Sequence, residues 1–223
     1  MLVPLTREAF EDLIPTVATG AQYGYYWGDF QTFLKRLLVS VVSLIVVVFL
    51  PVGLFSEPLK LLLGLVAALY WLWGPVAWAS ARNAKARRYP YCGFWHGKIL
   101  DIFVTEETIG TEETTNERGD LVIVENRERR FNLEVGDKTG FKTTIQVPLR
   151  RHHKAIRKGQ SAQMLVLSNQ PDLSRIGQVS DVYIADRNLW VSDYPYLERD
   201  RFIEISRELK SKRRNPRQAR SAR

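Results

Sequence analysis

The chain contains one cysteine, Cys92, and three histidines among its 223 residues. One cysteine cannot form a disulfide within the chain, which agrees with a reducing compartment. The adjacent His152 and His153 would point in opposite directions in an extended strand, so they make a poor chelating pair. His96 stands alone, and an ordinary hydrogen-bonded histidine is the simpler interpretation than a ligand of a metal or of a pigment magnesium. We therefore expect no metal site.

Sequence signatures of the common enzyme classes are also missing. The chain has no GxGxxG or GxxxxGK[ST] phosphate loop, no HExxH or CxxC metal motif and no GxSxG nucleophile elbow. Acidic runs in turn regions are normally solvated faces, and nothing pairs the carboxylates for acid/base catalysis. These carboxylates are Glu106, Glu107, Glu112 and Glu113. We expect a protein without enzymatic activity and with no catalytic residues.

Basic residues exceed acidic ones by eight, and the excess is uneven. Residues 207–223 hold eight Lys or Arg and one Glu, a net charge of +7, which leaves residues 1–206 at +1. We expect a basic disordered tail at 207–223 that binds anionic lipid. A second basic cluster lies at 150–158. We expect no nucleic acid partner, because the aromatic-interleaved strips of single-strand readers are absent.

Two long apolar runs without charge, residues 37–55 and 61–81, dominate the first part of the chain. They contain 19 and 21 residues, and about 20 helical residues cross the roughly 30 Å hydrocarbon core of a bilayer. The rest of the sequence offers no helical bundle that would bury two such helices on all sides. We expect a membrane α-helical hairpin of two transmembrane helices within residues 30–81.

The charges beside the runs orient this hairpin. Lys35 and Arg36 precede the first run and four basic residues follow the second, whereas the connection between the runs holds Lys60 alone. The positive-inside bias then places both termini and the bulk of the chain on the cytoplasmic or stromal side. The N-terminal segment lacks the basic region and early apolar stretch of a signal peptide. The residues expected at the membrane surface are Arg82, Lys85, Arg87 and Arg88.

Aromatic residues gather at both ends of the hairpin. Residues 1–29 are expected to be membrane-proximal, with a short amphipathic helix at 7–14 and then an aromatic strip at the headgroup level. Gly74-Pro75 predicts a kink in the second helix. Trp71, Trp73 and Trp78 are interpreted as interfacial anchors. Contact with a pigment is the alternative, and we assign no cofactor.

From Trp95 onward the pattern alternates between apolar and polar residues, which is typical of half-buried β-strands. Residues 131–135 and 141–147 alternate on either side of the turn 136–140, which predicts an antiparallel hairpin. The other expected strands are 98–104, 108–113, 121–125, 163–168, 178–185 and 188–192. We expect an all-β sandwich or partly open barrel at 95–206, joined to the membrane hairpin by a basic linker at 82–94 and closed by a short helix at 202–209.

Eight unusual segments carry a resemblance to a known family. They are Pro15-Thr-Val-Ala-Thr-Gly20, Tyr25-Tyr-Trp-Gly-Asp29, Gly74-Pro-Val-Ala-Trp78, Arg82-Asn-Ala-Lys85, Tyr91-Cys-Gly-Phe-Trp95, Gly110-Thr-Glu-Glu113, Val124-Glu-Asn-Arg-Glu-Arg-Arg130 and Asn188-Leu-Trp-Val-Ser-Asp-Tyr-Pro-Tyr196. Together they resemble the cyanobacterial and chloroplast family named for acclimation of photosynthesis to environment, over about residues 5 to 203. The resemblance implies a thylakoid membrane location and association with photosystem II in assembly, repair or light acclimation. It supplies no catalytic residues.

These observations predict a non-catalytic thylakoid membrane adaptor, with photosystem II subunits as the expected partner. Exposed Tyr and Trp are favoured anchors at protein interfaces. The residues expected to bind the partner are Tyr25, Tyr26, Trp27, Trp190, Tyr194 and Tyr196. One alternative is a membrane-tethered β-domain that binds anionic lipid or RNA through 150–158 and the tail. Another is an uncharacterised membrane-tethered enzyme.

Overall fold

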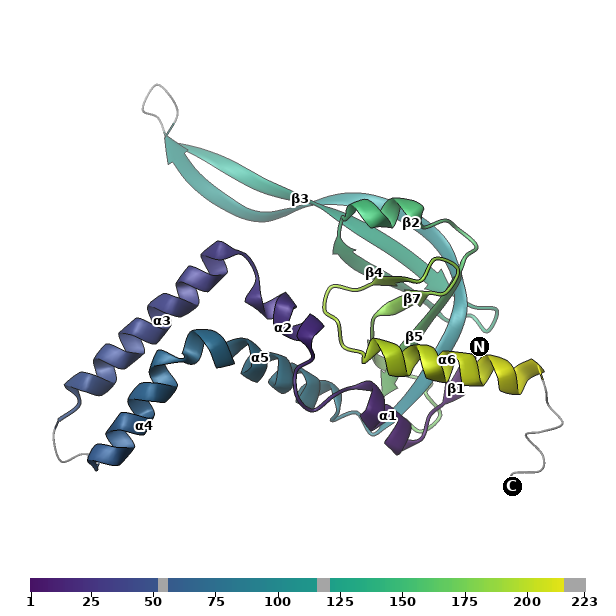
Figure 1. The fold of residues 1–223 in the computed structure, drawn as a ribbon. Helices are drawn as coiled ribbons and strands as arrows, with labels where there is room; N and C mark the ends of the chain where they lie inside the picture. Colours follow the sequence, from purple (N-terminus) through teal and green to yellow (C-terminus); the bar gives the residue numbers. More distant parts are fainter. Residues whose placement is uncertain (52–55, 116–120, 215–223) are drawn as a thin grey trace. The chain divides into compact units, whose positions relative to one another are not determined.

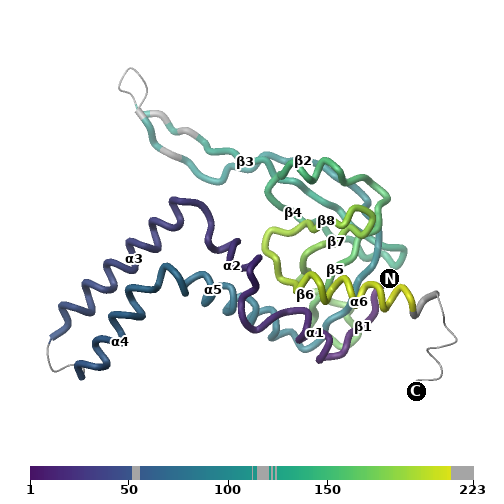
Figure 2. The backbone as a smooth tube through the Cα atoms, in the orientation of Figure 1, coloured from purple at the N-terminus to yellow at the C-terminus, as the bar shows by residue number. Residues whose placement is uncertain are grey.

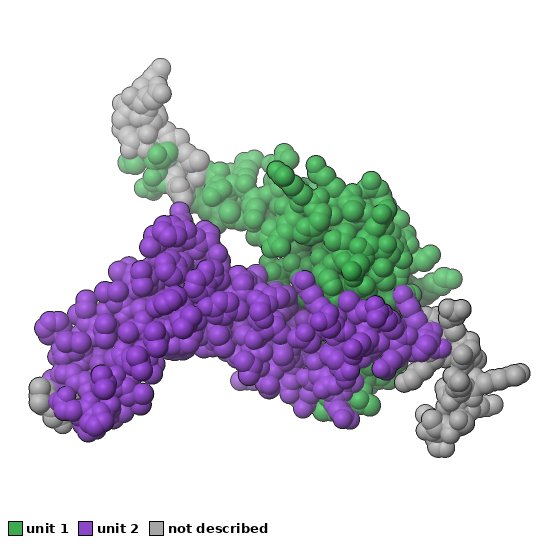
Figure 3. All heavy atoms as spheres, viewed as in Figure 1, with its two compact units in different colours: residues 1–7, 90–194 green, residues 8–89, 195–223 purple. Residues whose placement is uncertain are grey.

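The computed structural model describes residues 1–51, 56–115 and 121–214, which divide into two compact units (Figure 3). The β-unit consists of Met1–Arg7 and Pro90–Tyr194, and the helical unit of Glu8–Tyr89 and Pro195–Arg223. The chain therefore passes between the units three times. These units differ from the predicted division, because the β-unit also includes Met1–Arg7 and ends at Tyr194. The segment expected to be a basic linker, 82–94, belongs instead to a helix and a strand.

One antiparallel sheet makes up the β-unit (Figure 1). Its strands run in the order β4-β3-β2-β5-β7-β8, while β1 pairs with β2 and β6 with β5. The expectation of antiparallel strands is confirmed, and the sheet is open. All the strands described belong to one sheet, so the predicted sandwich of two sheets is wrong for the residues described. The strands are β1 Leu2–Pro4, β2 Tyr91–Thr115, β3 Leu121–Gly136, β4 Lys142–Pro148, β5 Ser161–Ser168, β6 Ile176–Val179, β7 Val182–Ile184 and β8 Leu189–Val191.

Strands β2 and β3 extend beyond the rest of the sheet as a two-stranded arm (Figure 1). Strand β5 pairs with β2 only over 91–98, and β4 pairs with β3 only over 130–136. Beyond these residues the two strands pair with each other alone, with ion pairs such as Glu106–Arg129 between them. The strands predicted at 98–104 and 108–113 are thus one strand, which continues through a register shift between Thr108 and Gly110.

The core of the β-unit lies on one face of this sheet. Trp95 is fully buried there, and its indole Nε1 donates to Asp137 Oδ2 at 2.9 Å. The second oxygen of Asp137 accepts the backbone N–H of Thr139 at 2.8 Å. Burial raises the pKa of this carboxyl, but the hydrogen bonds outweigh it and hold the pKa well below its usual range. Asp137 thereby fixes the turn between β3 and β4, where Gly140 adopts a positive φ of 93°.

Six α-helices are described, and Figure 2 traces them along the backbone. The short helix predicted at 7–14 is confirmed as α1, but the expected aromatic strip is largely a helix, α2, which Thr19 and Gln22 begin with a capping box. The C-terminal helix α6 runs past the predicted 202–209, so the segment expected to be disordered from 207 is helical to Arg214. The helices are α1 Arg7–Leu13, α2 Gly20–Trp27, α3 Phe30–Phe49, α4 Glu57–Ala68, α5 Tyr70–Ala86 and α6 Arg199–Arg214. A short 3-10 helix, η1, spans Arg151–Ala155.

The apolar runs form three helices rather than two. By length and composition α3 is apolar enough to cross a membrane, and α4 and α5 pass the same test only together, as one span bent by 76°. The bend lies at Leu69, between the two helices. No sequence signal predicts the break at Leu69, and Gly74-Pro75, where a kink is predicted, lies inside α5.

Candidate functional site

Helices α3 and α4 expose apolar side chains along their whole length. Only 6% of the apolar window of α3 is buried, and α4 has no buried residue. Gly64 of α4 faces Leu44 and Val47 of α3, where an added Cβ would lie 3.6 Å from Leu44 Cδ1. The two helices therefore pack closely together through one narrow face, and the remainder of each surface is an apolar patch of a kind that soluble monomers rarely expose.

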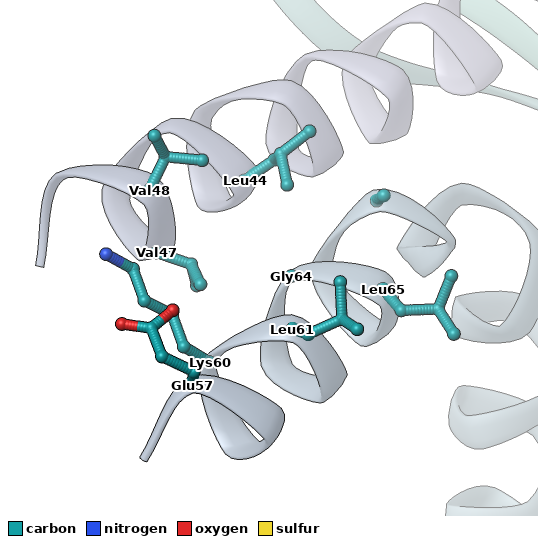
Figure 4. A pocket seen from close by; sticks show the side chains of 9 residues that line it. Leu44, Val47, Val48, Glu57, Lys60, Leu61, Gly64 and Leu65 are labelled. Carbon is teal, nitrogen blue, oxygen red and sulfur yellow. The ribbon is translucent and has the colours of Figure 1, made fainter. Parts of the chain in front are cut away.

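A groove of about 420 Å³ runs between α3 and α4 (Figure 4). Its walls are apolar, with Leu44 and Val48 on one helix and Leu61 and Leu65 on the other. Glu57 and Lys60 lie at one end of the groove. The ammonium group of Lys60 donates to the carbonyl of Leu50 at 3.2 Å, which ties the start of α4 to the end of α3.

The bend at Leu69 is held by side chains. In an uninterrupted helix the N–H of Trp71 would donate to the carbonyl four residues earlier. It donates instead to Ser40 Oγ of α3 at 3.0 Å. The carbonyl of Val66, which loses its helical partner at the break, accepts the indole N–H of Trp73 at 2.9 Å. Ser40 is the one buried residue of α3, and its sequence context shows only a small polar residue in an apolar run.

Removing the Ser40 hydroxyl is expected to destabilise the helical unit. Ser40→Ala leaves the N–H of Trp71 without this acceptor in an apolar environment, which costs about 1–3 kcal/mol of the free energy of unfolding. Ser43→Ala, one turn further along α3, is the matched control and should change it by less than about 0.5 kcal/mol. Unfolding of the purified chain in detergent micelles, followed by helical circular dichroism, measures both. Equal stability of the two variants would contradict this role of Ser40.

An aromatic cluster surrounds the bend. The ring centroid of Trp27 lies 5.7 Å from that of Phe33 and 6.2 Å from that of Trp71, and Tyr23 stacks on Trp27 at 5.4 Å. The hydroxyl of Tyr23 also donates to the carbonyl of Leu72 at 3.4 Å. Trp27, a residue of α2 that is predicted to bind a partner, therefore packs against α3 and α5.

Helix α5 has two distinct faces. Its buried residues are small or amide-bearing and recur at helical spacing, and they are Gly74, Pro75, Ala79, Asn83 and Ala86. The opposite side of the helix exposes Trp73, Trp78 and Lys85, and the exposed Arg88 follows just after the last residue of α5. Two of the four predicted membrane-surface residues thus lie exposed.

The other two predicted basic residues bind within the helical unit. The Arg82 Nε donates to the hydroxyl of Tyr196 at 2.9 Å, and the guanidinium lies over the rings of Tyr196 and Tyr25. Arg87 donates to the carbonyl of Ile14 and forms an ion pair with Glu11 at 3.3 Å. The structure therefore brings the predicted residues Tyr25, Arg82 and Tyr196 together, and these three side chains contact one another within the helical unit.

A buried amide pair holds the same region, and no local sequence signal indicates it. The Asn83 Nδ2 donates to Gln22 Oε1 at 2.8 Å, and the Gln22 Nε2 donates back to Asn83 Oδ1 at 3.1 Å. Gln22 Nε2 also donates to the carbonyl of Pro195 at 2.9 Å. Neither amide side chain is accessible to solvent. The pair joins α2, α5 and the segment that precedes α6.

Of the remaining predicted residues, Tyr26 lies on α2, with its ring centroid 5.2 Å from that of Tyr25, and Trp190 and Tyr194 lie in the β-unit. Trp190 is half-buried and its ring lies 4.8 Å from that of Tyr183. Tyr194 is only 2% exposed, so it offers almost no surface to a partner. Burial raises the pKa of the Cys92 thiol to about 12, with Arg7 opposing the shift, which leaves the thiol protonated and unreactive.

No group of three or more His, Cys, Asp or Glu that could hold a metal occurs in the described parts of the chain. His96 Nε2 lies 3.0 Å from the hydroxyl of Ser161, as expected of an ordinary hydrogen-bonded histidine. In η1, His153 is buried against Phe131, with ring centroids 4.5 Å apart, and its Nδ1 accepts the backbone N–H of Arg150. Burial, together with the nearby His152 and Arg150, lowers the pKa of His153 to about 4.

His153 is expected to make the β-unit acid-sensitive. Its pKa is about 4 in the folded chain against 6.5 when unfolded, so below pH 6.5 only the unfolded chain takes up the proton. The free energy of unfolding then falls by up to about 1.4 kcal/mol per pH unit between pH 6.5 and 4. Unfolding midpoints at pH 7.5 and 5 measure this. His153→Asn keeps an acceptor for Arg150 and should reduce the dependence. The exposed His152→Asn should retain it, and equal slopes for both variants would contradict the assignment.

Comparison with known proteins gives one result. No curated protein and no solved structure matches the chain. A protein-family model matches residues 3–214, which include both the exposed helices and the sheet. The chain therefore belongs to this family, which is described as a family of unknown function, DUF8619.

Proposed function

We propose that the chain is a membrane-anchored accessory protein whose helices α3 and α4 insert into a bilayer and hold the β-unit at its surface. One observation carries the proposal, which is that α3 leaves its apolar surface almost entirely uncovered. In a soluble protein such a helix would turn a stripe of this surface toward a core. In lipid a helix satisfies its own backbone groups and needs no such core.

Basic residues beside the apolar helices favour one orientation of the chain in the membrane. The basic residues Lys35 and Arg36 precede the uncharged part of α3, and Lys85 and Arg88 are exposed near the end of α5. The positive-inside bias favours a cytoplasmic or stromal location for this side. Anionic lipid is the proposed partner of the basic residues after 207, where about 1 kcal/mol per basic residue is available near a charged membrane.

The resemblance to the family named for acclimation of photosynthesis to environment supports a more specific role. We propose a non-catalytic adaptor of the thylakoid membrane that associates with photosystem II in assembly, repair or light acclimation. Among the predicted contact residues, Tyr25 is exposed and Tyr26, Trp27, Trp190 and Tyr196 are half-buried. These five keep some accessible surface, in contrast to Tyr194.

Two measurements on the tagged full-length chain test this function. Alkaline carbonate extraction of isolated membranes should leave the chain in the pellet, because integral proteins resist extraction and peripheral ones do not. Affinity purification from gently solubilised membranes should then recover photosystem II subunits in stoichiometric amounts. Release by carbonate would overturn the membrane anchor, whereas recovery of the chain alone would overturn the adaptor role and leave the anchor standing.

A further inference from the structure

We propose that α5 lies along the membrane surface instead of crossing the bilayer, with its exposed Trp73, Trp78 and Lys85, and Arg88 just after the helix, against the lipid headgroups. The inference rests on the proposed membrane anchoring by α3 and α4. The expected topology changes, because only the first part of the second apolar run, α4, then inserts into the membrane. The second part, α5, lies against the lipid headgroups.

The geometry of the helical unit supports this placement. Helix α4 has 12 residues and is about 18 Å long. Helix α5 leaves it at 76°, so α5 advances along the α4 axis by only about a quarter of its own length. An α4 that enters the bilayer along its normal therefore leaves α5 close to the membrane plane.

The bend is a built feature of the chain. Backbone groups at membrane depth must find partners within the protein, so a helix breaks there only where side chains replace the lost hydrogen bonds. Ser40 accepts from the N–H of Trp71, and Trp73 donates to the carbonyl of Val66. Both bonds join elements of the same unit, and together they supply partners for one N–H and one carbonyl at the break.

The level of the bend matches the position of the charges on α3. Ser40, which contacts the bend, comes four residues after Arg36. The uncharged part of α3 beyond this arginine, residues 37–49, is about 20 Å long, close to the length of α4. Both inserted segments thus begin near the aromatic cluster of Trp27, Phe33 and Trp71, and such clusters are typical of the headgroup region.

The chemistry of the exposed face of α5 fits an interface better than a hydrocarbon core. Trp73 and Trp78 expose part of their rings while their N–H groups donate to the Val66 carbonyl and the Tyr70 hydroxyl, and tryptophan is enriched at membrane–water boundaries. Lys85 and Arg88 follow, where an anionic lipid headgroup complements them. The opposite face is already covered, because Pro75, Ala79 and Asn83 are buried. The lipid surface is therefore the occupant that this face fits.

Site-directed spin labelling tests the placement in the full-length chain. Single cysteines would be introduced at Leu61, Leu65 and Ala68 of α4, and at Ala77, Ala81 and Ala84 on the exposed side of α5. Cys92 can remain, since it is buried and its pKa is raised to about 12, and the chain without an introduced cysteine is the labelling control. After reconstitution into vesicles of phosphatidylcholine and phosphatidylglycerol, accessibility to oxygen and to a nickel chelate gives the depth of each label.

The two arrangements predict different depths. We expect the α4 labels to differ in depth by about 1.5 Å per residue and the three α5 labels to agree within about 4 Å at the headgroup level. A depth that changes steadily by about 10 Å from Ala77 to Ala84, continuing the trend of α4, would overturn the proposal. Failure of the underlying anchor is distinguishable, because the α4 labels would then be accessible to the nickel chelate and not to lipid-dissolved oxygen.

Discussion

Replacing Val42 with arginine is expected to remove much of the protein from the membrane fraction. Val42 lies in the middle of α3 and is 50% exposed. In water a charge at an exposed position is harmless, but at the centre of an inserted helix an arginine costs about 2.5–3.5 kcal/mol. Each 1.4 kcal/mol is about a tenfold change in an equilibrium, so the carbonate-resistant fraction should fall severalfold or more.

Val17→Arg is the matched control for this experiment. Val17 is 66% exposed and lies between α1 and α2, outside the apolar helices. The same substitution there should leave the membrane-bound fraction unchanged. Equal membrane retention of Val42→Arg and Val17→Arg would contradict insertion of α3, whatever the expression level of either variant.

Trp95→Ala is expected to have the largest effect on the stability of the β-unit. The side chain is fully buried, and its ring packs against Phe141 with centroids 5.4 Å apart. Truncation of a buried tryptophan costs about 3–5 kcal/mol, and the lost indole N–H removes a partner of Asp137. A loss of this size approaches the whole stability of a small domain, about 5–15 kcal/mol.

Hydrogen exchange followed by mass spectrometry measures this loss on the full-length chain. Peptides from β2, β3 and β5 should lose most of their protection in Trp95→Ala. Trp190→Ala removes a half-buried indole on β8, at the edge of the sheet, and should reduce protection far less. A similar loss of protection in both variants would contradict the expectation that burial of Trp95 in the core causes the larger destabilisation.

Much of the β-unit could be predicted because its signals are local. Residues 131–135 and 141–147 alternate in hydrophobicity, and a five-residue turn joins them, so the pairing of β3 with β4 follows from the sequence. Strand β1 could not be predicted, since three residues are too few for a period and their partners, Gly93 to Trp95, are distant in sequence. Strand β2 has 25 residues, which exceeds the usual length of strands, so the sequence pattern predicts two shorter strands in its place.

The helical site was predictable in composition but not in geometry. The apolar runs identify α3 and α4, yet the second run continues without interruption through Leu69, where the structure bends. Proline is the usual sequence signal of a kink, and neither proline nor glycine stands beside Leu69, so no local signal predicts the break there. The bend depends on Ser40, which lies on another helix. Likewise, nothing beside Gln22 in sequence indicates that it pairs with Asn83.

The pairing of β1 with β2 determines the order in which the chain can mature during synthesis. The strand formed by Leu2–Pro4 is translated first, but its partner in β2 follows only after all of α3, α4 and α5. Strand β5, which closes the other edge of β2, comes later still. At about 5–20 residues per second, the helices emerge seconds before the sheet can close. Under the proposed anchoring, membrane insertion would precede folding of the β-unit. The first strand stays unpaired until the ribosome has made the fifth helix.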